Sequence, residues 1–121
     1  MTDRFRSPLR NEWDRMAPQF QTSAKAAGRE GAISRMMLDM MPAFCDALER
    51  ERDLGTPNHE FFDAVAAVCG ALIEEAIEQR TPAAQMAGRA AHLDQMFGLI
   101  NRVVRPRIAA PKASRLIVPE F

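Results

Sequence analysis

The sequence predicts an all-α fold: a small helical bundle of three main helices plus a short N-terminal helix, with an extended C-terminal tail containing proline and arginine. Apolar residues recur every three or four positions in three long segments, which is typical of amphipathic helices. Three dipeptides suited to starting a helix punctuate the chain. Only residues 115–118, Arg-Leu-Ile-Val, have the composition of a β-strand.

The helix starts are predicted from a hydroxyl residue followed by proline, at Ser7-Pro8, Thr56-Pro57 and Thr81-Pro82. The side-chain oxygen of the first residue can cap an N–H group of the first turn. Proline at the first helical position gives up a donor that has no partner there. We therefore expect helices to begin near the three prolines.

The first helix is expected to be short, because Pro18 would interrupt it. Trp13 and Met16 would dock it on the body. A methionine-rich segment then covers residues 32–53, with Pro42 inside it, so we expect either a kink or two abutting helices. Its apolar stripe comprises Met37, Met41, Phe44 and Leu48. A glycine at position 55 would end it.

The third helix, from Pro57 to about Gln79, is apolar on nearly all sides at its centre. A helix of that kind is usually buried, so we expect the segment around Val65 to Ile73 to be enclosed on every side. One short helix and two longer ones barely surround it. Either the rest of the chain wraps it completely, or a second chain covers it, which leads to the hypothesis of a homodimer or a partner protein.

The fourth helix is expected from Pro82 to Val104, because its apolar residues alternate at spacings of four and three. These residues are Met86, Ala90, Leu93, Phe97, Ile100 and Val104. We expect residues 1–104 to form a single helical domain. Residues 105–121 are expected to be an extended tail, because their prolines prevent a helix from continuing.

Charge is unevenly distributed although the net charge is zero. Residues 1–38 carry seven basic and four acidic side chains, residues 39–78 two basic and ten acidic, and residues 79–121 seven basic and two acidic. The acidic middle is interpreted either as a solvated face that the basic ends partly neutralise or as a bipolar surface that orients a partner.

Both cysteines, Cys45 and Cys69, lie among apolar residues at helical spacing, so we expect buried free thiols and a reducing compartment. The N-terminus has no apolar stretch typical of a secretory signal. The longest apolar run is too short to span a bilayer. We therefore expect a cytoplasmic protein without membrane contact.

No catalytic, cofactor or metal motif stands out, so we expect a protein that is not an enzyme and needs no cofactor. His59 and Asp63 lie one turn apart, but an ordinary solvated pair accounts for them better than a metal site. His92 is expected to be partly buried. The carboxylates Glu74, Glu75 and Glu78 are expected to meet arginines rather than to act in catalysis.

The leading hypothesis is a helical protein-interaction module, such as an adaptor, an inhibitor or a small subunit of a larger assembly. It would bind a protein partner or itself through an apolar helix face and its tail. The residues expected to bind are Met37, Met41, Phe44, Ile73, Ile77, Ile108, Leu116, Ile117 and Val118.

The alternative is a small all-α subunit that binds a nucleic-acid backbone inside a nucleoprotein complex. Five basic residues near the C-terminus form a run with no acidic residue between them, which suits phosphate contacts. They are Arg102, Arg105, Arg107, Lys112 and Arg115.

Overall fold

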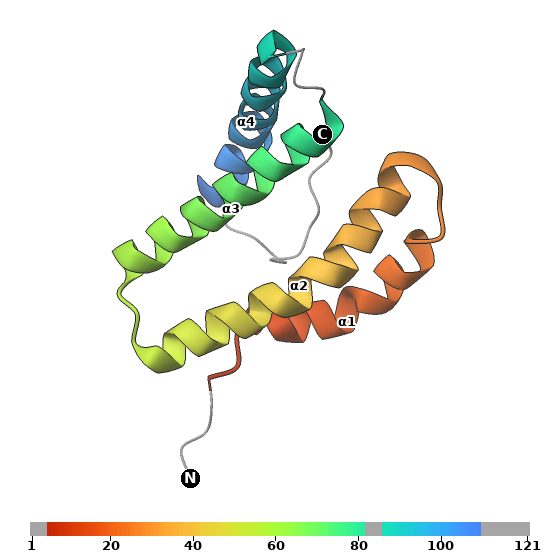
Figure 1. Cartoon of the computed structure of the whole chain (residues 1–121). Helices are drawn as coiled ribbons and strands as arrows, with labels where there is room; N and C mark the ends of the chain where they lie inside the picture. The colour runs from red at the N-terminus through yellow and green to blue at the C-terminus, as the bar shows by residue number, and fades with distance from the viewer. Residues whose placement is uncertain (1–4, 82–85, 110–121) are drawn as a thin grey trace. The chain divides into compact units, whose positions relative to one another are not determined.

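The computed structural model describes residues 5–81 and 86–109, and over these ranges the chain forms four α-helices and no strand (Figure 1). The helices are α1 (Pro8–Ser23), α2 (Gly28–Leu54), α3 (Asn58–Arg80) and α4 (Met86–Ala109). The all-α prediction is confirmed. The chain divides between Thr56 and Pro57 into two compact units, one of α1 with α2 and one of α3 with α4. That residues 1–104 form one domain stays a prediction.

The start of α1 is the one that the Ser-Pro pair predicts. Ser7 is the N-cap, its backbone is extended, and Pro8 opens the helix. The Oγ atom of Ser7 accepts a hydrogen bond from the backbone N–H of Arg10 at 3.2 Å. The cap therefore satisfies one of the N–H groups that a helix start leaves without an intrahelical partner.

The start of α3 lies one residue later than the Thr-Pro pair predicts. Pro57 itself is the N-cap, and it makes no side-chain cap bond. The hydroxyl of Thr56 instead donates to Oε1 of Glu51 at 2.9 Å, at the end of the preceding helix. The predicted start at Pro82 falls outside the described residues.

Three prolines lie inside helices, and this corrects two predictions and excludes one of the two alternatives for Pro42; the other alternative, a kink at Pro42, stays a prediction. Helix α1 continues through Pro18 to Ser23, so it is not the short helix expected. Helix α2 is one helix through Pro42 rather than two abutting ones. Helix α4 continues through Pro106, so residues 105–109 are helical rather than extended, while 110–121 lie outside the described residues. An internal proline costs roughly 3 kcal/mol, mostly through one lost hydrogen bond, which the remaining turns and packing of a long helix offset.

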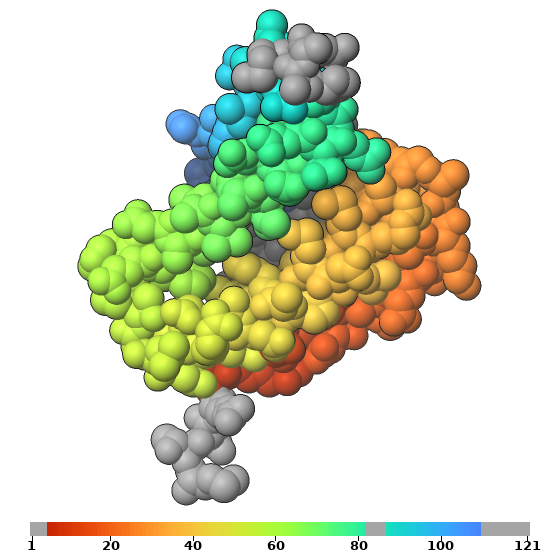
Figure 2. All heavy atoms as spheres, in the orientation of Figure 1, coloured from red at the N-terminus to blue at the C-terminus, as the bar shows by residue number. Residues whose placement is uncertain are grey.

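The α1–α2 unit has a small core on one side of each helix. Trp13 and Phe20 of α1 are buried, and their ring centroids lie 5.3 Å apart. On α2, Ser34 and Cys45 are buried, and Cys45 is fully enclosed. The predicted docking of α1 through Trp13 is confirmed. Figure 2 shows the atoms of α1 and α2 packed against each other along the length of the unit.

The turn between α1 and α2 closes tightly over Gly31. A Cβ atom at this position would lie 1.8 Å from the carbonyl oxygen of Ala26, so only glycine fits. The Nη1 atom of Arg35 donates to the carbonyl oxygens of Ala24 at 2.9 Å and of Ala26 at 3.3 Å. The carbonyls that follow α1 are thereby bound by a side chain from the first turns of α2.

The α3–α4 unit is a helix pair with little enclosed interior. The backbone oxygen of Thr81, which follows α3, accepts a hydrogen bond from Nη2 of Arg89 in α4 at 2.9 Å. Thr81 is buried, but α3 itself has no buried residue. Within the described residues, the segment from Val65 to Ile73 is therefore not enclosed on every side, and its enclosure by a second chain stays a prediction.

None of the helices in the described ranges combines the length and the apolar character needed to cross a membrane.

Candidate interaction surface

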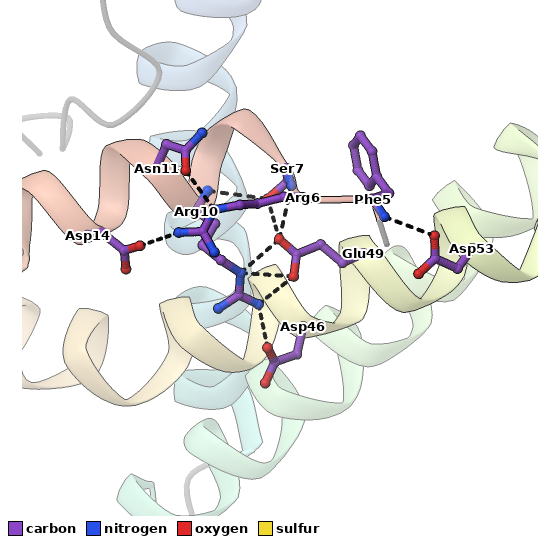
Figure 3. A network of polar contacts seen from close by, with 9 residues as sticks. All are labelled: Phe5, Arg6, Ser7, Arg10, Asn11, Asp14, Asp46, Glu49 and Asp53. Carbon is purple, nitrogen blue, oxygen red and sulfur yellow. Dashed lines mark hydrogen bonds and ion pairs between the residues drawn. The ribbon is translucent and has the colours of Figure 1, made fainter. Parts of the chain in front are cut away.

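The most elaborate polar cluster of the described residues joins the start of α1 to the end of α2 (Figure 3). The Nε atom of Arg10 donates to both carboxylate oxygens of Glu49, at 2.8 and 2.7 Å, and its Nη2 atom forms an ion pair with Asp46. The backbone N–H of Ser7 also donates to Glu49, at 2.9 Å. Residues that are 36 to 42 positions apart are thus bound together.

The cluster changes the protonation behaviour of its members. The pKa of Glu49 is lowered to about 2, first by the side-chain hydrogen bond from Arg10 and then by the backbone hydrogen bond from Ser7. The same bonds to Glu49 and Asp46 raise the pKa of Arg10. Every carboxylate oxygen of Glu49 has a donor, so the geometry favours a permanently ionised pair that fixes α1 on α2 rather than an acid or base for catalysis.

The two cysteines differ sharply in their surroundings. Cys45 is fully buried, and burial raises the pKa of its thiol. Cys69 is exposed on α3, so the prediction of two buried thiols holds only for Cys45. His92 is also exposed, which corrects the expectation that it is partly buried. Within the described ranges, no three His, Cys, Asp or Glu side chains are arranged to hold a metal ion.

Apolar side chains that face solvent are the most extensive feature of the surface. On α2 they are Met36, Met40, Phe44 and, at the end of the helix, Leu54. The first three are each four residues from the next, which places them on one stripe. Of the binding residues predicted on this helix, Phe44 belongs to the stripe, whereas Met37 and Met41 are half-buried. The exposed stripe therefore contains Met36 and Met40 in place of the predicted Met37 and Met41.

The second exposed set lies on α3 and α4 and is called the α3–α4 apolar surface. It consists of Phe62, Val68, Leu72, Leu93, Phe97, Ile100 and Ile108. Phe62 is 66% exposed and Ile108 is 73% exposed, values that a core residue does not have.

Of the residues predicted to bind a partner on these helices, one is exposed and two are half-buried. Ile108 belongs to the α3–α4 apolar surface, while Ile73 and Ile77 are half-buried. Leu116, Ile117 and Val118 lie outside the described residues. Of the basic residues proposed for nucleic acid, Arg102 and Arg105 are exposed and Arg107 is half-buried. Lys112 and Arg115 lie outside the described residues.

Each of the seven side chains of the α3–α4 apolar surface is at least 38% exposed. Full burial of a Leu, Ile or Phe side chain stabilises a protein by about 1.5–3 kcal/mol. Leu72 is 50% exposed and Phe97 is 47% exposed, so each forgoes a sizeable part of that gain. Covering all seven residues would contribute several kcal/mol, against a total stability of about 5–15 kcal/mol for a typical domain.

Sequence reasoning identifies most of these residues but assigns them to the wrong surroundings. Leu93, Phe97 and Ile100 are part of the periodic stripe that predicts the fourth helix, and a periodic stripe is usually core. The spacing shows that a helix has an apolar face, but it does not show what covers that face. Met36 and Met40 carry no separate signal within the methionine-rich segment.

Comparison with known proteins finds no family model that matches the chain, no similar curated protein and no similar solved structure.

Proposed function

We propose that this protein is a non-enzymatic helical interaction module that binds a protein partner or a second copy of itself through the α3–α4 apolar surface. The observation that supports it is the exposure of seven large apolar side chains on one two-helix unit, in which α3 has no buried residue. Contiguous apolar patches on a soluble protein are characteristic of interaction sites. The cytoplasmic location is part of the proposal and agrees with two free cysteines.

The physical reason for association is that water-exposed apolar area is removed on binding. An amphipathic helix pair with exposed apolar side chains is suited to receive another helix against those side chains. Phe62, Leu72 and Phe97 would supply the large contacts that usually dominate the energy of such an interface.

The nucleic-acid alternative has less support from the charges of this unit. Arg102 and Arg105 are exposed on α4 and could approach phosphates. Helix α3 of the same unit carries five carboxylates and one arginine. Its net negative charge would repel a phosphate backbone.

The experiment that tests the proposal compares association of the full chain with that of the double variant Leu72→Asp/Phe97→Asp. Self-association is followed by sedimentation, and capture of partners is followed by cross-linking in an extract of the source cells. The proposal expects the double variant to lose whichever association the wild-type chain shows.

The matched control is Gln95→Glu, which adds a negative charge to α4 at an exposed position. Gln95 lies two residues before Phe97, on the other side of the helix. The control is expected to associate like the wild-type chain. Retention of association by Leu72→Asp/Phe97→Asp, with unchanged helix content, would reject the proposed surface.

A further inference from the structure

We infer that the occupant of the α3–α4 apolar surface is a second copy of this chain, whose own α3 and α4 complete an antiparallel four-helix bundle with the first pair. The inference rests on the proposed function and specifies its partner. It follows from the incomplete enclosure of the two helices and from the way charge is distributed between them.

Enclosure is the first step. Helix α3 is 23 residues long and has no buried residue, and no side chain described in α4 is buried either. Two helices can bury only the narrow seam between them. Four helices around a common axis enclose one stripe of each, which is why bundles of this size use four. A second α3–α4 pair supplies the missing two.

Charge is the second step. Helix α3 carries five carboxylates and one arginine, a balance of −4. Helix α4 carries four arginines and one aspartate, a balance of +3. In a square arrangement of two pairs, each α3 lies beside two α4 helices and each α4 beside two α3 helices. Helices of like charge then face each other only across the diagonal, where their separation is largest.

Symmetry is the third step. Two identical chains most often associate about a two-fold axis, so each contact occurs twice. In an antiparallel arrangement the start of one helix lies beside the end of its neighbour, so the exposed carboxylates at the start of α3, Glu60 and Asp63, lie level with the exposed arginines near the end of α4, Arg102 and Arg105. A two-fold pairing that sets α3 beside α4 of the other copy therefore brings a negative helix to a positive one twice.

A partner of uniform charge matches only half of this surface. A basic partner would suit α3 and be repelled by α4, and an acidic partner or a nucleic acid would suit α4 and be repelled by α3. A second copy presents both signs, in the complementary order. It also presents the same apolar residues, so both copies bury them in one event.

The test exchanges the charges of the two helices in separate variants. The first variant is Glu60→Lys/Asp63→Lys, and the second is Arg102→Glu/Arg105→Glu. Wild-type chain is expected to sediment as a species of two 13.5 kDa chains. Each variant brings like charges together in its own dimer and is expected to dimerise roughly tenfold or more weakly.

Mixing the two variants is the decisive experiment. In the mixed dimer, the positive start of one α3 lies beside the negative end of the other copy's α4, and the negative start of the other α3 lies beside the positive end of the first copy's α4, so dimer formation is expected to return to near the wild-type level. If a variant is poorly folded by circular dichroism, helix content is also expected to return on mixing. Arg15→Glu, an exposed charge reversal on α1, is the control and is expected to dimerise like the wild type.

Three results would overturn the inference: a wild-type chain that stays monomeric at concentrations up to roughly 100 μM, exchanged variants that dimerise as tightly as the wild type, or a mixture that forms no mixed dimer. These are separable from failure of the proposed function. A monomer that captures another protein, and loses it in Leu72→Asp/Phe97→Asp, refutes the second copy and leaves the interaction surface standing. A dimer that survives Leu72→Asp/Phe97→Asp refutes the surface itself.

Discussion

Gly31 shows how one missing side chain shapes the α1–α2 unit. Its helical φ imposes no need for glycine, but the carbonyl oxygen of Ala26 occupies the place where a Cβ atom would be, 1.8 Å away. Sequence reasoning treats such a glycine as a helix breaker. Its actual role is to allow the turn to approach the helix. That role depends on the contact with Ala26, which cannot be predicted from the spacing of residues in the sequence.

Gly31→Ala is expected to lower the free energy of unfolding of the α1–α2 unit by about 1–3 kcal/mol, because the turn must move to admit the methyl group. Trp13 is the only tryptophan and is buried in this unit, so its fluorescence during urea unfolding measures the effect.

The matched control is Gly98→Ala in α4, where a Cβ atom would meet nothing within 4 Å. There the better helix propensity of alanine should stabilise α4 by about 0.5–1 kcal/mol and leave the Trp13 transition unchanged. An unaltered transition for Gly31→Ala would show that the turn is looser than the structure describes.

Glu49 is the residue through which pH should act on this unit. Its pKa is lowered from the ordinary 4.5 to about 2 by Arg10 and Ser7. A carboxylate with a lowered folded-state pKa contributes stability that is complete above pH 4.5 and is lost as the pH falls toward 2.

Glu49→Gln should therefore lower stability at neutral pH and reduce the further loss between pH 4.5 and about 2. Urea midpoints followed by Trp13 fluorescence across this range provide the measurement. Glu60→Gln, at an exposed carboxylate at the start of α3, serves as the control. A wild-type acid transition reproduced in full by Glu49→Gln would exclude Glu49 as its cause.

The thiols of Cys45 and Cys69 should react at very different rates with a thiol reagent. Cys45 is buried and its raised pKa keeps it protonated, so it should react only on unfolding. Cys69 is exposed on the apolar side of α3 and should react rapidly in dilute protein. If a second copy covers α3, the rate at Cys69 should fall as protein concentration rises. Rapid reaction of Cys45 in folded protein would contradict the buried position.

At the scale of the element, the two Ser/Thr-Pro pairs in the described ranges look alike in sequence and behave differently. Ser7 caps α1 and also lies beside Glu49, whereas the hydroxyl of Thr56 donates to Glu51 and Pro57 is the cap of α3. The local pattern is sufficient to place both helix starts to within one residue. It is not sufficient to identify the capping group, because that depends on where the preceding helix ends.

Ser7→Ala should lower the stability of the α1–α2 unit by about 1 kcal/mol through loss of the cap, as measured by Trp13 fluorescence in urea. Thr56→Ala should leave the start of α3 unchanged, since its hydroxyl caps nothing there; amide hydrogen exchange at residues 58–61 reports this. Equal effects of the two variants on their respective helices would refute the distinction.

Among the features of the helices, the internal prolines differ most from what the sequence predicts. Pro18, Pro42 and Pro106 are expected from sequence to end, kink or divide helices, and each lies inside one. The rule that proline interrupts a helix takes account of the lost backbone hydrogen bond. It does not weigh the contacts of neighbouring turns, such as those of Phe20 two residues after Pro18, which hold the helix in place.

For the whole molecule, the helical content could be predicted from periodicity, because an apolar repeat of 3.6 residues is characteristic of an amphipathic helix and does not suit a strand. The end of α1, the start of α2 and the end of α4 could not be predicted in this way. The pairing of Arg10 with Glu49 could not, since the two residues are 39 positions apart and many other pairings satisfy the same charges. The exposure of Phe62, Leu72 and Phe97 could not be predicted either. Sequence shows that these residues avoid water, and only the fold shows that they are exposed on the helix pair that carries them.

The most direct test of the central claim, that α3 and α4 are completed by association, is amide hydrogen exchange of the full chain over a range of protein concentrations. The account predicts that exchange in α3 and α4 slows as concentration rises, while exchange in α1 and α2 stays constant. Exchange in α3 that is independent of concentration, in a chain that sediments as a monomer throughout, would contradict it.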